Sequence, residues 1–389
     1  MKGMVKGGIL FLLGGLLVCL LGEAVEAEDA PGEWKPIAWL TGSFSRLYFI
    51  DEKTGWAIGA NGAILHTADG GKNWAKQESG TDAALQDLYF ANEKVGWVVG
   101  SSAREGSLKL RLPLGGEYHR GLGNVILHTR DGGKSWVKQS SGTSVPLNGL
   151  HFLNETLGWV VGASQTLLFT QDGGASWSKK GKKKGWMDQA KGALGALLGA
   201  RPSQSAPDLQ GIRFLSPKVG WIIGRGLILR TADGGESWVA SELDLSFQRR
   251  SEQFDCHGAF FLDEETGWVV GSLGENPSER ESRAEGFILY TQNGGKSWRM
   301  QYYKSGERIE AIQFLDSQLG WAIGSKGGSG PAARSGLLLY TLDHGETWTE
   351  WPRPDMPMAG LRSLFFLKGR AGWALSERGE VFQYQKKDE

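Results

Sequence analysis

The chain has 389 residues, a formal net charge of zero, 59 glycines and 17 tryptophans. The balanced charge gives no indication of nucleic acid as a partner or of a strongly acidic substrate. Such a high content of glycine and tryptophan favours many short strands joined by tight turns, and a single closed repeat domain can account for this length.

The N-terminal segment has the pattern of an export signal. Lys2 and Lys6 precede an apolar run at 7–21, which is shorter than the roughly 20 residues that a membrane-spanning helix needs. We therefore expect residues 1–27 to be a signal peptide or, if uncleaved, an N-terminal anchor, and the protein to be exported to the periplasm or another extracytoplasmic membrane face. Removal of the signal would leave Cys256 as the only cysteine, so an intrachain disulfide is excluded.

The first repeated motif is a Phe followed seven positions later by the Trp of a Gly-Trp pair. Each Gly-Trp opens a short apolar stretch that predicts a buried strand. The seven pairs are Phe49 with Trp56, Phe90 with Trp97, Phe152 with Trp159, Phe214 with Trp221, Phe261 with Trp268, Phe314 with Trp321 and Phe366 with Trp373. Such constant spacing indicates seven copies of one structural unit.

A second motif, of the form Thr-x-Asp-Gly-Gly-x-x-Trp, follows six of these pairs. Its copies lie at 67–74, 129–136, 170–177, 231–238, 291–298 and 341–348. We interpret it as a hairpin in which the Asp accepts backbone N–H bonds, a Gly takes a positive φ angle and the Trp starts the next strand. Asn293 and His344 depart from the pattern at positions that the turn should tolerate.

The seventh copy of the second motif is missing at the C-terminus, where 381–384 supplies a strand and the chain ends soon after. Trp34, 15 residues before Phe49, has the place of the missing tryptophan. We therefore predict an all-β fold, with residues 28–389 forming one seven-bladed β-propeller of four-stranded blades that an N-terminal strand closes.

Insertions between the repeats should all lie on one face of this propeller. They occupy 101–124, 178–208, 241–257, 272–285 and 325–335, after the second or the fourth strand of a blade. Variable loops on a rigid scaffold commonly carry binding function, although insertions also accumulate where they do no harm, because long loops cost little closure entropy. Their one-sided placement favours binding.

Two of the insertions are basic, including the largest, at about 178–208, and we expect them to contact a partner. The candidate partner-binding residues are Arg104, Lys109, Arg111, Arg120, Lys179, Lys180, Lys182, Lys183, Lys184 and Trp186. A basic patch can steer an acidic protein or an anionic membrane surface, but a lysine run can equally be a solvated loop.

An apolar stripe at helical spacing starts at Trp186, directly after the lysine cluster, and continues through Leu194 and Leu198. It could lie on a membrane or in a partner's groove, or it could pack back onto the propeller rim. Gly192 and Gly195 weaken such a helix, so it could form only on contact.

The paired motifs resemble the photosystem II stability/assembly factor family of propellers, and the second motif resembles the Asp-box (BNR) repeat shared with sialidases. The likeness extends from Trp34 to Tyr384. It implies a non-catalytic assembly factor that holds a membrane-protein precursor, in the thylakoid lumen if the source is photosynthetic. The long insertions depart from the compact family pattern, so another envelope complex is an equally suitable partner. We expect a monomer.

The rival interpretations are a sialidase-like glycoside hydrolase and a carbohydrate-binding propeller. Arg111 is part of an Arg-Leu-Pro sequence like the arginine motif of sialidases, but it lies in an insertion, and Tyr302 and Tyr303 near Glu307 and Glu310 have no distinctive spacing. No pattern for a metal, a cofactor or a catalytic triad is visible. We therefore predict no catalytic, cofactor-binding or metal-ligating residue, and leave carbohydrate binding open.

Overall fold

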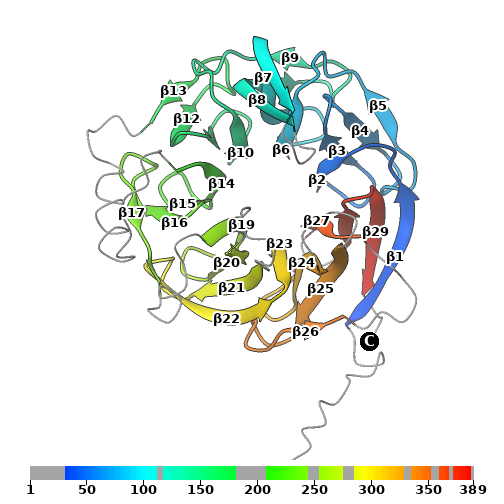
Figure 1. Cartoon of the computed structure of the whole chain (residues 1–389), viewed down its shortest axis with the longest axis vertical. Helices are drawn as coiled ribbons and strands as arrows, with labels where there is room; N and C mark the ends of the chain where they lie inside the picture. Colours follow the sequence, from blue (N-terminus) through cyan, green and yellow to red (C-terminus); the bar gives the residue numbers. More distant parts are fainter. Residues whose placement is uncertain are drawn as a thin grey trace, which may run out of the picture.

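The architecture is a closed ring of seven β-sheets around a central channel, seen in a computed structural model (Figure 1). The structure describes residues 31–111, 117–180, 207–243, 254–274, 284–327, 334–351, 359–367 and 371–386. Within these ranges no helix is long and apolar enough to cross a membrane. The predicted all-β, seven-bladed propeller is confirmed.

In each blade the strands follow one another from the channel outward. The innermost strands are β2 (Phe44–Phe49), β6 (Ala84–Phe90), β10 (Leu147–Phe152), β14 (Leu209–Phe214), β19 (Phe254–Phe261), β23 (Glu307–Phe314) and β27 (Leu361–Phe366). The second strands are β3 (Gly55–Gly59), β7 (Gly96–Arg111), β11 (Gly158–Gly162), β15 (Gly220–Gly224), β20 (Gly267–Leu273), β24 (Gly320–Gly327) and β28 (Gly372–Ser376). Blades 1 to 7 are numbered in this order.

The outer half of each blade consists of a third strand and an outer strand. The third strands are β4 (Ile64–Thr67), β8 (Glu117–Thr129), β12 (Thr166–Thr170), β16 (Leu227–Thr231), β21 (Glu285–Thr291), β25 (Arg334–Thr341) and β29 (Glu380–Lys386). The outer strands are β5 (Ala75–Gln77), β9 (Val137–Lys138), β13 (Ser178–Lys179), β17 (Val239–Ala240), β22 (Ser297–Ser305), β26 (Thr349–Glu350) and β1 (Gly32–Trp39). Blade 7 thus contains both ends of the described chain.

At six of the seven junctions between blades, a repeated Trp stacks on the repeated Phe of the next blade. Trp56 of blade 1 stacks on Phe90 of blade 2, with ring centroids 3.5 Å apart and planes 10° from parallel. The same stack joins blade 7 to blade 1, where Trp373 lies 3.8 Å from Phe49. A Cβ on Gly55 would lie 2.4 Å from the Phe49 ring, which explains why glycine precedes this tryptophan.

The second motif forms the predicted hairpin turn. In blade 1 the Thr67 hydroxyl donates to Asp69 Oδ1 at 2.9 Å and accepts from the Gly71 amide at 2.9 Å. Asp69 Oδ1 also accepts from the Asn73 amide at 2.9 Å. These bonds satisfy several polar groups of the turn from within the motif, while the Gly70 amide donates to the Lys53 carbonyl and the Gly70 carbonyl accepts from Trp373 Nε1.

The N-terminal strand closes the ring as predicted. β1 pairs antiparallel with β29, so that Trp34 lies opposite Tyr384. Trp34 is 8% exposed and meets Phe366 edge to face at 5.7 Å, the geometry that Trp74 of the second motif has with Phe49 at 6.1 Å. Trp34 therefore takes the place of the missing seventh motif tryptophan.

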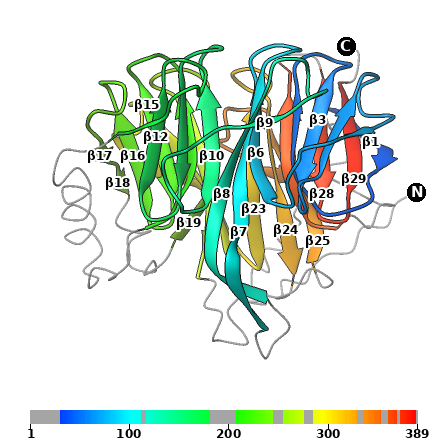
Figure 2. The same cartoon turned by 90° about the horizontal axis from the view of Figure 1, so that it is seen from above.

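Two features differ from the sequence prediction. Blade 5 has five strands instead of four, because β18 (Glu242–Leu243) leaves blade 4 and pairs parallel with β22 of blade 5. The insertion at 101–124, expected as a loop, is largely a continuation of β7 and β8, and this hairpin projects from one face of the ring (Figure 2). The antiparallel backbone hydrogen bonds between β7 and β8 continue beyond the blade, from Gly96 opposite Thr129 to Arg111 opposite Glu117.

Candidate functional site

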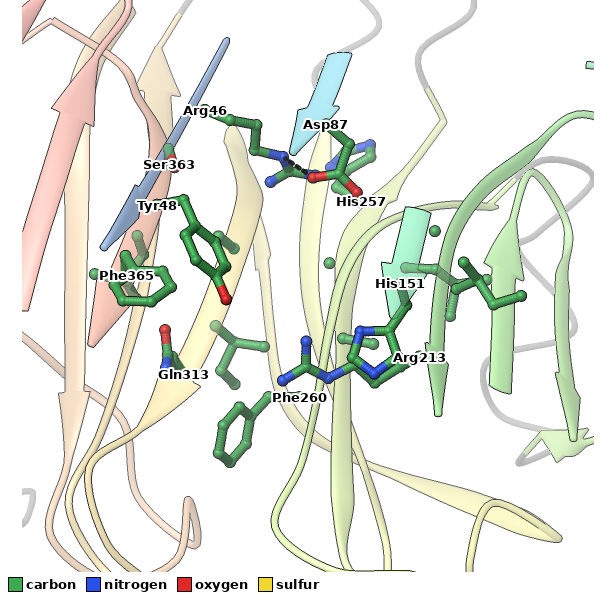
Figure 3. A pocket seen from close by; sticks show the side chains of 18 of the residues that line it. Arg46, Tyr48, Asp87, His151, Arg213, His257, Phe260, Gln313, Ser363 and Phe365 are labelled. Atoms are coloured by element: carbon green, nitrogen blue, oxygen red, sulfur yellow. Dashed lines mark ion pairs between the residues drawn. The ribbon is translucent and has the colours of Figure 1, made fainter. Parts of the chain in front are cut away.

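The central channel encloses a cavity of about 210 Å³ lined by the seven innermost strands. Two tiers of residues on these strands surround the channel. The Phe-side tier comprises the residues just before each repeated Phe, namely Tyr48, Tyr89, His151, Arg213, Phe260, Gln313 and Phe365. The insertion-side tier comprises the residues three before each Phe, namely Arg46, Asp87, Gly149, Gly211, Gly258, Ala311 and Ser363. Figure 3 shows members of both tiers around the cavity.

Three polar residues of the Phe-side tier bind the backbone of the next blade. Tyr48 Oη donates to the Phe90 carbonyl at 3.0 Å, and His151 Nε2 lies 2.8 Å from the Phe214 carbonyl. Gln313 makes two bonds, donating to the Phe366 carbonyl and accepting from the Phe366 amide, each at 2.9 Å. An innermost strand has one unpaired edge, and these side chains satisfy part of it.

His151 is neutral in this position. Burial lowers the pKa of His151 well below its usual range, and the nearby Arg213 guanidinium lowers that pKa further. Because a carbonyl accepts from Nε2, the proton is on Nε2. His151 is therefore a structural donor at neutral pH.

The insertion-side tier contains an ion pair. Arg46 Nε lies 3.6 Å from Asp87 Oδ1, while Asp87 Oδ2 accepts from the Leu150 amide of blade 3 at 3.0 Å. Burial raises the pKa of Asp87, and Arg46 and the amide act against that rise. Ser363 likewise accepts from the Leu47 amide at 3.0 Å. The Asp87 carboxylate is thus occupied by Arg46 and by the Leu150 amide of blade 3.

Further charges lie at the insertion-side mouth of the channel. Arg225 Nε and Nη2 bind the two carboxylate oxygens of Asp255 at 2.9 and 3.1 Å, joining blades 4 and 5. Arg362 Nε lies 3.5 Å from Glu377 Oε1. His257 Nδ1 lies 2.9 Å from the Ile309 carbonyl, and burial lowers the pKa of His257. The mouth is thus mixed in charge.

The candidate partner-binding residues fall into three groups. Arg104, Lys109, Arg111 and Arg120 lie on the backbone of the projecting hairpin. Lys179 is exposed on β13, whereas the Lys180 ammonium pairs with Glu236 and lies 4.5 Å over the Phe169 ring. Lys182, Lys183, Lys184 and Trp186, like the signal segment and most of the basic insertion, lie outside the described residues.

Lys180, predicted to contact a partner, makes contacts within its own domain. Its side chain is 17% exposed, because it folds onto the blade between Glu236 and Phe169. Blade 3 therefore continues through Lys180, two positions beyond the expected start of the insertion at Ser178.

The tyrosines and glutamates considered for the hydrolase interpretation lie on different strands. Glu307 and Glu310 belong to β23, the innermost strand of blade 6, where Glu310 Oε2 lies 3.8 Å from His257 Nδ1. Tyr302 is on the outer strand of blade 5, where its hydroxyl donates to Glu307 Oε2 at 2.7 Å. His66 and His128 occupy the same position in blades 1 and 2 and both pack on a repeated tryptophan, with ring centroids 5.2 Å apart for His66 and Trp56 and 5.0 Å apart for His128 and Trp97. Among the described residues no group of three His, Cys, Asp or Glu could hold a metal ion.

The sequence analysis missed the two channel tiers. The sequence does identify these residues, because they lie one and three positions before each repeated Phe. Their identities vary from blade to blade, so a search for recurring residues passes over them. Of the two, the Phe-side tier carries the greater chemical variety.

Comparison with known proteins gives related propellers. The family model described as photosynthesis system II assembly factor YCF48 matches residues 19–108. A curated relative, the photosystem II assembly lipoprotein Ycf48 of Synechococcus sp. (strain CC9902), is 25% identical over 138 residues, which are 35% of this chain and 34% of that protein. The alignment thus spans about a third of the relative's length.

Solved structures match over nearly the whole chain. YCF48 bound to D1 peptide has a TM-score of 0.60 and 16% identity, covering 93% of this chain and 96% of that one. YCF48 from Cyanidioschyzon merolae has a TM-score of 0.62 and 17% identity, with coverages of 90% and 98%. The Niastella koreensis GH74 enzyme has a TM-score of 0.61 and 12% identity, covering 90% of this chain and 53% of the enzyme. At these identities the shared feature is the propeller fold.

Proposed function

We propose that this chain, a seven-bladed β-propeller that resembles the photosystem II assembly factor Ycf48, is an exported, non-catalytic scaffold that binds a membrane-protein partner or assembly intermediate. The partner docks on the insertion face, defined as the face from which the β7–β8 hairpin projects. That projecting hairpin is the observation on which the proposal rests (Figure 2).

The two faces of the ring differ in what they offer a partner. The opposite face is formed by the motif turns, whose Thr and Asp side chains satisfy their own backbone amides, as at Thr67 and Asp69. The insertion face instead has strands of unequal length, and β7 with 16 residues extends far beyond β3 with 5. An irregular face on a rigid ring suits selective recognition.

The hairpin also offers charge. Lys109 lies opposite His119, and Arg111 opposite Glu117, in the ladder of β7 and β8, with Arg120 opposite Leu108. Basic residues thus occur at several positions along the ladder. Basic groups of this kind suit an acidic segment of a partner or an anionic membrane surface.

The relatives support a membrane-protein partner. One similar structure is of YCF48 with a D1 peptide bound, and the curated relative is a photosystem II assembly lipoprotein. By analogy we place this protein on an extracytoplasmic membrane face, in the thylakoid lumen if the source is photosynthetic. The long hairpin leaves room for a partner other than D1.

The test is a tagged pull-down from detergent-solubilised membranes with a shortened hairpin. Residues 103–122 are replaced by Asn-Gly, which favours the tight turn between two antiparallel strands. A second variant changes Lys179, Lys182, Lys183 and Lys184 to Ser, and leaves Lys180 in place because Glu236 and Phe169 hold it. The control changes Lys72 and Lys134, exposed in motif turns on the opposite face, to Ser.

We expect wild type and the control to retain a membrane-protein complex that the shortened variant loses while its thermal unfolding is unchanged. Retention of the complex by both insertion-face variants would place the docking surface elsewhere. If wild type recovers no membrane protein but binds glycans, the carbohydrate-binding alternative replaces the scaffold, and turnover of a glycan would make the protein a hydrolase.

A further inference from the structure

Arg213 differs from every other polar member of the Phe-side tier. It is exposed, and Figure 3 shows its guanidinium extending from β14 past His151 into the cavity. Among the described residues no carboxylate lies within ion-pair distance of Arg213, whereas Arg46 in the other tier has Asp87. A cation in a confined channel without a counter-charge is favourably placed to bind an anion.

The position of Arg213 is not explained by the contact between blades. Blades 1, 3 and 6 use Tyr48, His151 and Gln313 of the same tier to bind the following blade. Blade 4 is joined to blade 5 by other means. Arg225 pairs with Asp255 at the mouth, and β18 crosses from one blade to pair with the other.

The strap formed by β18 is itself well bonded. The Glu242 amide donates to the Lys296 carbonyl at 2.9 Å, and the Ser241 hydroxyl donates to the Gly295 carbonyl at 2.5 Å. The Gly226 amide donates to the Phe254 carbonyl at 2.7 Å. Blade 4 is therefore held on blade 5 without help from Arg213, which leaves its side chain free for another role.

The surroundings of Arg213 in the cavity carry no charge apart from the Arg46–Asp87 pair, and much of the wall is aromatic. His151 is neutral, and Tyr48, Tyr89, Phe260 and Phe365 supply aromatic surface to the cavity wall. The charged side chains that line the cavity are Arg46, Asp87 and Arg213. Since the first two cancel, the described lining carries one net positive charge.

We propose that the central channel is a binding site for a small carboxylate, whose two oxygens are held by Arg213 and whose apolar body lies among the aromatic side chains of the Phe-side tier. A planar guanidinium binds a carboxylate through two parallel hydrogen bonds, which fixes orientation as well as charge. A cavity of about 210 Å³ has room for on the order of ten water molecules, the size of a small organic acid.

The proposal predicts selection by charge and shape. The neutral amide of the same acid offers one carbonyl oxygen and an N–H₂ group that would face the guanidinium donors, so it should be rejected. The same carboxylate chemistry could come from a free acid or from the C-terminus of a peptide. The site is independent of the docking surface on the insertion face, so each can fail without the other.

The experiment measures binding of 4-fluorobenzoate to the full-length protein by fluorine NMR, with 4-fluorobenzamide as the neutral ligand. Arg213→Gln removes the cation and Arg213→Lys keeps its charge without the planar fork. Arg130→Gln is the matched control, because Arg130 is an exposed arginine in a motif turn. Circular dichroism and the thermal midpoint verify that every variant is folded.

We expect 4-fluorobenzoate to bind wild type and Arg130→Gln with equal affinity, and Arg213→Gln and 4-fluorobenzamide each to weaken binding at least tenfold. The affinity of Arg213→Lys for 4-fluorobenzoate should fall between those of wild type and Arg213→Gln. Gly-Gly-Phe as free acid and as C-terminal amide then distinguishes the sources, since binding of the free peptide acid without binding of 4-fluorobenzoate would assign the carboxylate to a chain terminus. If neither acid binds, or if binding survives Arg213→Gln, the proposal is wrong.

The pull-down described above separates this site from the proposed function. Arg213→Gln should retain the membrane-protein complex, because the substituted side chain lies inside the channel. Loss of the complex from the folded Arg213→Gln variant would show that Arg213 serves the partner, and would overturn the assignment of the channel as an independent site.

Discussion

The aspartates of the motif turns are the residues on which acid stability should depend. Asp69 is held chiefly by the Asn73 amide and side chain, and Asp131 and Asp172 by the side chains and amides of Ser135 and Ser176. These hydrogen bonds to the charged form lower the pKa of each of the three carboxyls to about 2. Such bonds contribute stability only while the carboxylate is ionised.

The resulting prediction concerns stability between about pH 4 and pH 2. The folded-state pKa of about 2 lies below the ordinary value of 3.8, so the contribution is present above about pH 4 and is lost as the pH falls through 2. The triple variant Asp69→Asn, Asp131→Asn, Asp172→Asn should therefore show a smaller drop in thermal midpoint over this range than wild type. Thermal melts followed by circular dichroism at each pH measure it.

The chain contains its own control for this substitution. Asn293 occupies the aspartate position in blade 5, and its Oδ1 accepts from the Thr291 hydroxyl at 2.9 Å and from the Ser297 amide at 3.0 Å. Asparagine therefore preserves the turn, while removing the charge. Equal acid sensitivity in wild type and the triple variant would refute the assignment.

At the scale of elements, side chains hold the innermost strands to one another. Their positions can be predicted from the sequence, but their hydrogen-bond partners cannot. The place of Gln313, directly before Phe314, can be read from the repeat, and so can that of Tyr48. Which backbone group each one meets depends on the stagger of neighbouring blades. A bulge in each inner strand, between Ile309 and Ala311 in blade 6, sets that stagger.

The strongest of these contacts is expected to be that of Gln313, because both of its polar groups bind Phe366. Gln313→Leu would leave the Phe366 amide and carbonyl without their partner, at a cost of about 1 to 3 kcal/mol in the free energy of unfolding. Urea unfolding measures this loss. The matched control is Gln210→Leu, since Gln210 is exposed on the inner strand of blade 4.

The control should change the free energy of unfolding by less than about 0.5 kcal/mol, the usual range for a surface site. Similar effects of the two substitutions would show that the Gln313 bonds do not hold blades 6 and 7 together.

At the scale of the whole molecule, stability depends on closure of the ring. Trp34 packs against Trp321 at 5.6 Å and Tyr384 at 5.4 Å, so it joins the N-terminal strand to blades 6 and 7 together. Trp39, at the end of the same strand, is 65% exposed. The two tryptophans therefore allow the closing contact to be tested within one strand.

Trp34→Ala should reduce the free energy of unfolding by about 3 to 5 kcal/mol, because it removes a large buried ring at the junction. Trp39→Ala should change it by less than about 0.5 kcal/mol. Chemical unfolding of both variants, compared with wild type, makes the measurement. A small loss for Trp34→Ala would mean that the backbone pairing of β1 and β29 suffices for closure.

The sequence predicted the blades because seven copies of one Phe and Gly-Trp motif recur at fixed spacing, and six of them make the same contact, as in Trp56 on Phe90. It failed at features that occur once. The strap β18 between blades 4 and 5 and the place of Arg213 in the channel each occur in one blade, and no repeat reveals them. The contacts of Lys180 could not be predicted either, because its neighbours in sequence are lysines, whereas its neighbours in space are Glu236 and Phe169.

The pairing of β1 with β29 also imposes an order on biosynthesis. Lys35 and Gln385, which are bonded across this seam, are 350 positions apart in the chain. At about 5 to 20 residues per second, roughly 20 to 70 seconds pass between the synthesis of the two strands. Until then blade 7 cannot assemble and the ring stays open. In a chain exported during its synthesis, the ring would thus stay open while the chain crosses the membrane and would close only after its C-terminal strand has been translocated.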